Sequence, residues 1–80
     1  MNGAEAQEVR HLLLASNDQY RELVNLHHAL DDRLHQLTEK HYLSNSEQVE
    51  EVTLKKRKLA LKDQMERIAT SWVREHPHSS

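Results

Sequence analysis

Apolar residues recur at alternating steps of three and four positions along two long stretches of this 80-residue chain, with two histidines and one lysine among them. In the first stretch these positions are Tyr20, Leu23, His27, Leu30, Leu34, Leu37 and His41. In the second they are Leu54, Lys58, Leu61, Met65, Ile68 and Trp72. We call the two sets the first seam and the second seam. Such spacing is typical of the a and d positions of packed helices, so each stretch is predicted to be a long helix with one apolar face.

Ser44 is predicted to begin the second of these helices. Its hydroxyl group can accept a hydrogen bond from the backbone N–H of Glu47, and the Glu47 carboxylate can accept one from the N–H of Ser44. This reciprocal arrangement, the capping box, satisfies two backbone donors at a helix start. The chain is therefore expected to reverse direction just before Ser44.

The predicted fold is a single all-α domain, an antiparallel helical hairpin. A short turn forces its flanking helices to run antiparallel, and Pro77 cannot continue the second helix. The elements expected within residues 1–80 are a short helix at 4–15, a helix at 18–41, a turn at 42–44, a helix at 45–75 and a tail at 76–80.

The N-terminal segment is predicted to be a separate short helix. Its apolar positions follow helical spacing at Val9, Leu12 and Leu13. Ser16 and Gln19 have the spacing of a second capping box, so a break is expected near 16–17. Folded back, this helix would cover the open end of the hairpin and bring Leu12 or Leu13 to Trp72.

Residues at similar distances from the turn are expected to face each other across the hairpin. This places Leu34 near Leu54 and Asp31 close to Lys58. A lysine in an apolar seam can lay its methylene groups on the core while its ammonium group meets a carboxylate at the edge. We therefore expect an Asp31–Lys58 ion pair. Glu47 lies off the second seam and is expected to face solvent.

Apolar residues outside the seams predict self-association. They are Val24, Leu26, Val49, Val52 and Leu59. A two-helix layer of this size buries little apolar surface, and pairing two hairpins into a four-helix bundle would bury more. We therefore expect a homodimer, with Val24, Leu26, Val52 and Leu59 as interaction residues. The same helix faces are candidates for binding a partner protein.

Composition argues against several classes of function. The chain has no cysteine, which excludes disulfides, thiolate metal sites and cysteine nucleophiles. Its longest apolar run, Leu12 to Ala15, is too short to span a membrane. The first residues lack the basic and apolar regions of a signal peptide. Without a glycine-rich phosphate loop or a strained turn, we expect a cytoplasmic protein that is not an enzyme and carries no cofactor.

Histidines provide one candidate metal site and one candidate pH response. His28, Asp32 and His35 share a helix face, and imidazole and carboxylate groups are ligands of zinc and nickel. One helix seldom supplies a complete coordination shell, so a solvated stripe is favoured and no metal is expected. His27 and His41 occupy the first seam, where protonation on acidification would loosen the bundle.

The run Lys55-Lys56-Arg57-Lys58 supports an alternative function. With Lys62 added, it has the composition of a nucleic-acid-binding patch. On a helix, however, these side chains fan around the axis, and the net charge of the chain is −2. A solvated helix with pairs such as Glu51–Lys55 is therefore favoured. The leading prediction is a small interaction or accessory module, and the alternative is a nucleic-acid-associated protein using Lys55, Lys56, Arg57 and Lys62.

Several short motifs resemble a known family. They are Tyr20-x-x-Leu23, His27-His28-x-Leu30-Asp31, Tyr42-Leu43-Ser44 and Lys55-Lys56-x-Lys58-Leu59-x-Leu61-Lys62-Asp63-x-Met65. With these motifs, residues 17–70 resemble the small bacterial YdcH-like family, a domain of unknown function with a lysine-rich KKxKLxLKDEI signature. Ser44-Asn45 stands where the family often has Thr-Pro, and residues 71–80 lie outside the pattern. The resemblance implies a helical hairpin in a bacterial cytoplasm and supplies no catalytic residues.

Overall fold

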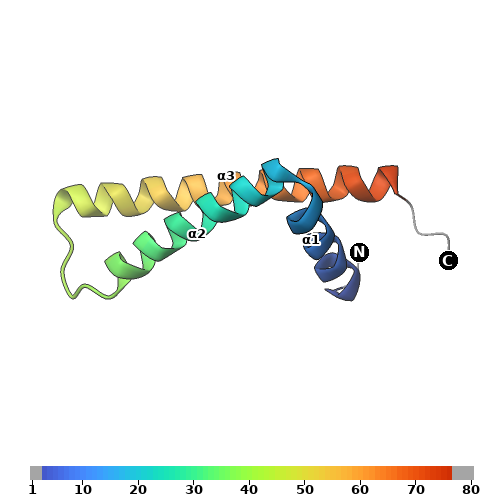
Figure 1. Cartoon of the computed structure of the whole chain (residues 1–80). Coiled ribbons are helices and arrows are strands. Elements are labelled where there is room, and N and C mark those ends of the chain that lie inside the picture. The colour runs from blue at the N-terminus through green and yellow to red at the C-terminus, as the bar shows by residue number, and fades with distance from the viewer. Residues whose placement is uncertain (1–2, 77–80) are drawn as a thin grey trace.

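The structure is a computed structural model in which residues 3–76 are described. These residues form three helices, α1 (Gly3–Ser16), α2 (Asp18–Thr38) and α3 (Asn45–Glu75), and contain no strand. The all-α class is therefore confirmed. α2 and α3 lie side by side in opposite directions, which makes the molecule elongated, with extents of 53 × 21 × 17 Å (Figure 1). Most of the expected tail, residues 77–80, lies outside the described residues.

The junction of α1 and α2 differs from the expected capping box. Asn17 is the N-cap of α2, and its side-chain oxygen accepts a hydrogen bond of 2.8 Å from the backbone N–H of Tyr20. Ser16 is instead the last residue of α1, and its hydroxyl group donates to the carbonyl oxygen of Leu12 at 2.6 Å. The break was predicted at the right place, but the Ser16–Gln19 capping box was wrong. Asparagine is at least as good an N-cap as serine, and here only Asn17 has the extended backbone that the position needs.

α2 ends at Thr38, three residues before the predicted end at 41, so the connection to α3 spans residues 39–44. His41 therefore lies exposed in the turn, and its predicted place in the first seam was wrong. The cause is Leu43, whose side chain packs against the buried cluster at this end of the molecule. The chain can present Leu43 to that cluster only by leaving the helix early.

α3 has the predicted bounds and begins with the predicted capping box. The backbone N–H of Glu47 donates to the Ser44 hydroxyl oxygen at 3.2 Å, and the N–H of Ser44 donates to the Glu47 carboxylate at 3.0 Å. Glu47 does not face solvent as expected, because its side chain is only 19% exposed and meets the ammonium group of Lys40. The residue that caps α3 thus also holds the turn.

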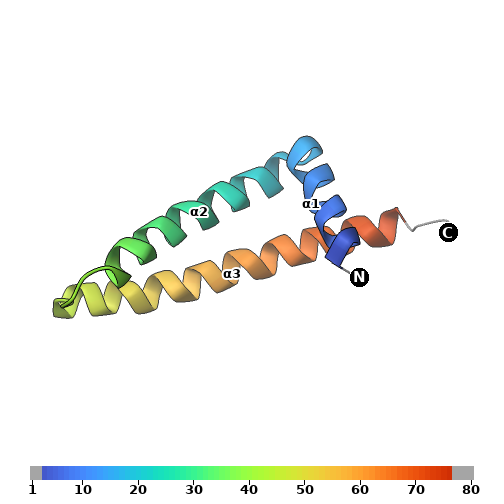
Figure 2. The same cartoon turned by 90° about the horizontal axis from the view of Figure 1, so that it is seen from below.

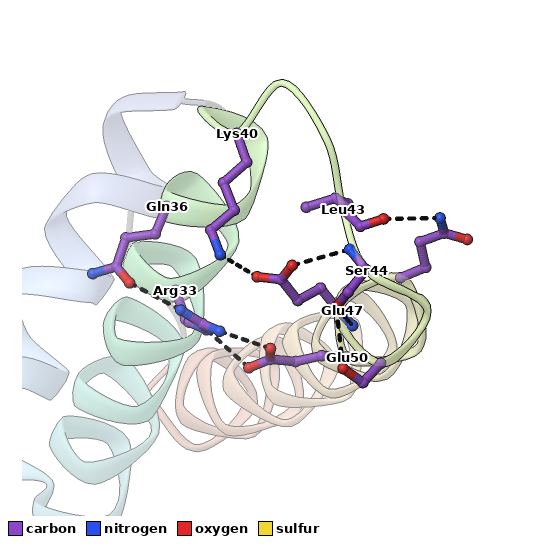
Figure 3. A network of polar contacts seen from close by, with 9 residues as sticks. Arg33, Gln36, Lys40, Leu43, Ser44, Glu47 and Glu50 are labelled. Carbon is purple, nitrogen blue, oxygen red and sulfur yellow. Dashed lines mark hydrogen bonds and ion pairs between the residues drawn. The ribbon is translucent and has the colours of Figure 1, made fainter.

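A second polar contact joins α2 to α3 just beyond the turn. The guanidinium group of Arg33 donates two hydrogen bonds of 2.9 Å to the carboxylate of Glu50, and a third of 3.2 Å to Gln36 (Figure 3). A paired, planar contact of this kind fixes orientation as well as distance. It therefore sets the rotation of α2 against the first turns of α3.

Within residues 3–76, all the buried apolar residues except Leu23 form two clusters at opposite ends of the molecule. The turn cluster consists of Leu34, Leu37 and Leu54, with Leu30 and Leu43 packed against it. The end cluster consists of Val9, Leu13 and Tyr20, with Leu14, Val24, Met65, Ile68, Ala69, Trp72 and Val73 packed against it. The predicted proximity of Leu34 to Leu54 and of Leu13 to Trp72 is confirmed at the level of these clusters.

α1 acts as a wedge between α2 and α3. In Figure 2, α2 diverges from α3 as it approaches its own first residue, and α1 folds back across the opening. Val9 and Leu13 of α1 are buried there beside Tyr20 of α2 and residues of α3. Because the wedge fills the open end, α2 and α3 do not pack tightly along their full length.

Candidate binding groove between α2 and α3

A groove of about 1180 Å³ follows the divergence of α2 and α3 on one side of the molecule. Its apolar lining includes Val24 from α2 and Leu59, Met65 and Ala69 from α3. Leu59 is 67% exposed, although it stands in the middle of the chain's longest helix. The groove therefore offers apolar surface to a binding partner.

Positive groups line the α3 side of this groove. Lys55, Lys58 and Lys62 recur at steps of three and four, so they follow one face of the helix. Arg10 of α1 adds a further cation at the wedge end. The groove also contains two carboxylates, Asp31 and Glu66, so its cations outnumber its acids when the histidines are neutral.

The ion pair predicted between Asp31 and Lys58 is present and crosses the groove from α2 to α3. Its hydrogen bond to the Lys58 ammonium group lowers the pKa of the Asp31 carboxyl below its ordinary value. Both side chains remain substantially exposed, so the contact contributes little to stability. Its structural effect is to hold the ammonium group of Lys58 at the edge of the second seam, beside Asp31.

Three histidines, His27, His28 and His35, line the α2 side of the groove. The rings of His27 and His28 meet edge to face, with centroids 6.3 Å apart. Burial lowers the pKa of His27 below its ordinary value, and the positive charge of Lys58 lowers it further. The neutral form of His27 is therefore favoured until the solution becomes more acidic.

The weak metal candidate His28, Asp32 and His35 does not come together as a site. His28 and His35 line the groove, whereas Asp32 does not, and His35 lies 3.5 Å from the carboxylate of Glu39. Nowhere in residues 3–76 do three or more histidine, aspartate or glutamate side chains gather closely enough to hold a metal ion.

The four predicted interaction residues do not share one surface. Val24 and Leu59 line the groove, and Val24 also packs against the end cluster. Leu26 lies in a smaller hollow of about 260 Å³ with Leu30, Arg57, Ala60 and Leu61. Val52 lines neither, and it is 52% exposed on the remaining surface of α3. A single partner face cannot contain all four.

The basic run is divided in the same way. Lys55 and Lys62 line the groove, Arg57 lines the smaller hollow, and Lys56 lines neither. Lys55 also lies 3.7 Å from the carboxylate of Glu51, the i,i+4 pair expected from the sequence. The four candidate basic-patch residues, Lys55, Lys56, Arg57 and Lys62, therefore do not form one surface.

Sequence reasoning missed the role of Glu47 and the contact of Arg33 with Glu50. Helical spacing placed Glu47 off the seam, but the turn brings Lys40 back over it. For Arg33 and Glu50 a signal existed, since opposite charges lie at comparable distances on either side of the turn.

Hydrogen bonds from Lys40 and from the Ser44 backbone lower the pKa of Glu47 to about 2.

Comparison with known proteins identifies the family. Residues 20–69 match the model of a family described as a protein of unknown function, DUF465. The chain belongs to this family. The match agrees with the resemblance to YdcH-like proteins. It covers most of α2, the turn and α3 as far as Ala69, and so contains every lysine and histidine of the groove but not Arg10.

The DUF465 match is not accompanied by a functional precedent. Searches of the curated proteins and of the solved structures found no match. Within residues 3–76, no helix combines the length and the apolar character needed to cross a membrane.

Proposed function

We propose that this DUF465 protein is a non-catalytic helical interaction module that forms a homodimer and binds a partner protein through a helix face. Support comes from the balance of apolar side chains. Among the described residues, almost as many large apolar side chains are exposed as are buried. The exposed ones are Leu12, Leu26, Tyr42, Val49, Val52 and Leu59. Exposed apolar side chains that gather on one face, as Val49, Val52 and Leu59 do on α3, are typical of interaction surfaces.

Self-association is assigned to the outer surface of α3. Val49, Val52 and Leu59 are all exposed and spaced by three and seven residues, so they share one face of the helix. Pairing this face with its equivalent on a second copy would bury them and produce a bundle of two hairpins. The core of one chain is small, so the additional burial has a large relative effect on stability.

Molar mass measured by light scattering after size-exclusion chromatography tests the dimer. The chain mass is 9.4 kDa, and we expect the wild type to show twice that value. Val52→Glu would place a charge in the dimer interface without touching the groove, and we expect it to shift the mass to that of one chain. Gln64→Glu adds the same charge at another exposed position of α3 and should leave the dimer intact.

Two results would contradict self-association. One is a wild-type mass of a single chain throughout a concentration series. The other is a dimer that survives in Val52→Glu and in Leu59→Glu with unchanged helix content by circular dichroism. In that case the exposed apolar side chains of α3 would need another explanation.

A further inference from the structure

The cations of the groove are incompletely neutralised within the chain. Lys58 is paired with Asp31, and Lys55 lies within ion-pair distance of Glu51. Within residues 3–76, Lys62 and Arg10 have no ion-pair partner, although both line the groove. The groove therefore has positive charge available for an anionic ligand.

The spacing of the lysines matches a helix rather than a compact anion. Lys55 and Lys62 lie two helical turns apart, which corresponds to about 10 Å along α3. Lys58 lies between them. Carboxylates placed at steps of three and four on a neighbouring helix repeat with the same period, so several can meet this row together.

The apolar part of the groove decides between a helix and a nucleic acid. Leu59 and Met65 lie beside the lysine row, and methionine adapts its shape readily to different apolar partners. An amphipathic helix would bury its leucines on these residues while its acidic edge meets the lysines. A nucleic acid would use the cations but leave Leu59 and Met65 uncovered. No tryptophan, tyrosine or phenylalanine other than the buried Tyr20 lines the groove for base stacking.

The histidines add a response to pH. His27 faces Lys58 and Lys62 of α3, together with Asp31 and His28 of its own helix, while Arg10 and Glu66 complete the charged lining. Neighbouring cations and burial disfavour the protonated ring in the free protein. A carboxylate bound in the groove would favour protonation, so proton uptake and binding would strengthen each other.

We infer that the groove between α2 and α3 binds an acidic amphipathic helix of a partner protein, and that protonation of His27 tightens the binding. This inference rests on the proposed function and gives its partner a chemical class. Apart from Leu59, which belongs to both, the groove lining differs from the outer face of α3 that is assigned to self-association.

Fluorescence anisotropy with synthetic helices tests the charge preference. The first probe is an amphipathic peptide with a leucine stripe flanked by glutamates, and the second carries lysines in place of those glutamates. We expect the acidic peptide to bind at least tenfold more tightly. Equal binding of the two peptides, or no binding of the acidic one, would overturn the inference.

Matched variants locate the binding site. Lys62→Gln should weaken binding of the acidic peptide about two- to fivefold, the usual effect of one exposed charge at an interface. Lys56→Gln removes the same charge from the same helix outside the groove and should leave the affinity unchanged. Equal weakening by both would indicate attraction to general positive charge and contradict a site in the groove.

A pH series tests the histidines. Between pH 8 and pH 6 we expect the affinity for the acidic peptide to rise about threefold or more, since its glutamates stay ionised throughout. The variant His27→Gln, checked for unchanged helix content by circular dichroism, should flatten this rise, and His11→Gln, which changes an exposed histidine outside the groove, should not. A rise that is unchanged in His27→Gln, or an affinity that falls with acidification, would contradict the inference.

Two further measurements separate this inference from the proposed function. Val52→Glu, a monomer if self-association is correctly assigned, should still bind the acidic peptide. Loss of peptide binding in this variant would place the peptide on the dimer surface and overturn the assignment to the groove. A labelled DNA duplex that binds more tightly than the acidic peptide at equal salt would favour the nucleic-acid alternative instead.

Discussion

The ammonium group of Lys40 donates a hydrogen bond to the carboxylate of Glu47 across the turn that joins α2 to α3. The same carboxylate accepts the N–H of Ser44, so one side chain both caps α3 and closes the turn (Figure 3). A charge used in this way makes the fold sensitive to acid.

Acid should destabilise the protein through Glu47. The pKa of Glu47 is lowered from 4.5 to about 2, first by Lys40 and then by Ser44, so the unfolded chain binds its proton more readily than the folded chain does. The stabilisation is therefore fully present above about pH 5 and is lost as the pH falls toward 2. Asp31 and Glu50, whose pKa values are also lowered, act in the same direction.

Thermal unfolding followed by circular dichroism between pH 6 and pH 2 measures this effect. Glu47→Gln should lower the melting temperature at pH 6 and reduce its dependence on pH below 5. Glu22→Gln, at an exposed position without a hydrogen bond among the described residues, serves as the control. A Glu47→Gln profile parallel to that of the wild type would show that the contact contributes nothing.

Asn17→Ala should destabilise the protein by about 1 kcal/mol, because the backbone N–H of Tyr20 would lose its capping acceptor. Ser16→Ala, one residue earlier, should change stability by only a few tenths of a kcal/mol, since its hydroxyl returns to a carbonyl of its own helix. Chemical denaturation of both variants at one protein concentration compares them. The reverse order would mean that Ser16 is the true cap in solution.

Leu13→Ala should destabilise the protein by about 2–5 kcal/mol, the usual range for a leucine truncated in a core. Leu13 is 1% exposed in the end cluster, whereas its neighbour Leu12 is 43% exposed. Leu12→Ala should therefore cost less than about 1 kcal/mol. Similar losses for the two variants, measured by the same denaturation, would argue that α1 does not dock as described.

Lys58→Gln should raise the pKa of His27. The lysine lowers that pKa through its positive charge, and its removal also frees the Asp31 carboxylate, which acts in the opposite direction. Titration of the imidazole protons by NMR gives the value directly. Lys56→Gln, which lies outside the groove, is the control and should leave the His27 titration where it is.

Much of the fold follows from local pattern. The seams and the Ser44–Glu47 capping box depend only on residues three or four positions apart. Such residues lie on the same face of a helix, so their spacing predicts the contact directly. Asp31 and Lys58 were also predictable, because a turn relates positions on its two sides by simple counting. These features need no knowledge of how the helices diverge.

The errors arose where local rules allow two answers. Ser16 and Asn17 are both good N-cap residues, and the choice depends on where α1 ends. The end of α2 depends on the packing of Leu43 against the turn cluster, which periodicity does not report. His41 was misplaced for that reason.

The candidate site was the least predictable part. Val24 and Leu59 were singled out as apolar residues off the seams, but nothing in their spacing showed that they line one groove with the lysines. Leu26 stands two residues after Val24, so helical spacing alone already places the two side chains on different faces of α2. The opening of the groove was not predictable, because it depends on the divergence of α2 from α3 at the end where α1 packs.

α1 acts as a spacer between the two long helices. Val9 and Leu13 set how far apart α2 and α3 stand at one end, while the turn holds them together at the other. The distance between α2 and α3 at the open end therefore depends on the side chains of α1. Neither Val9 nor Leu13 lines the groove. Truncation of either side chain would thus bring α2 closer to α3 and narrow the groove, although neither residue belongs to the groove lining.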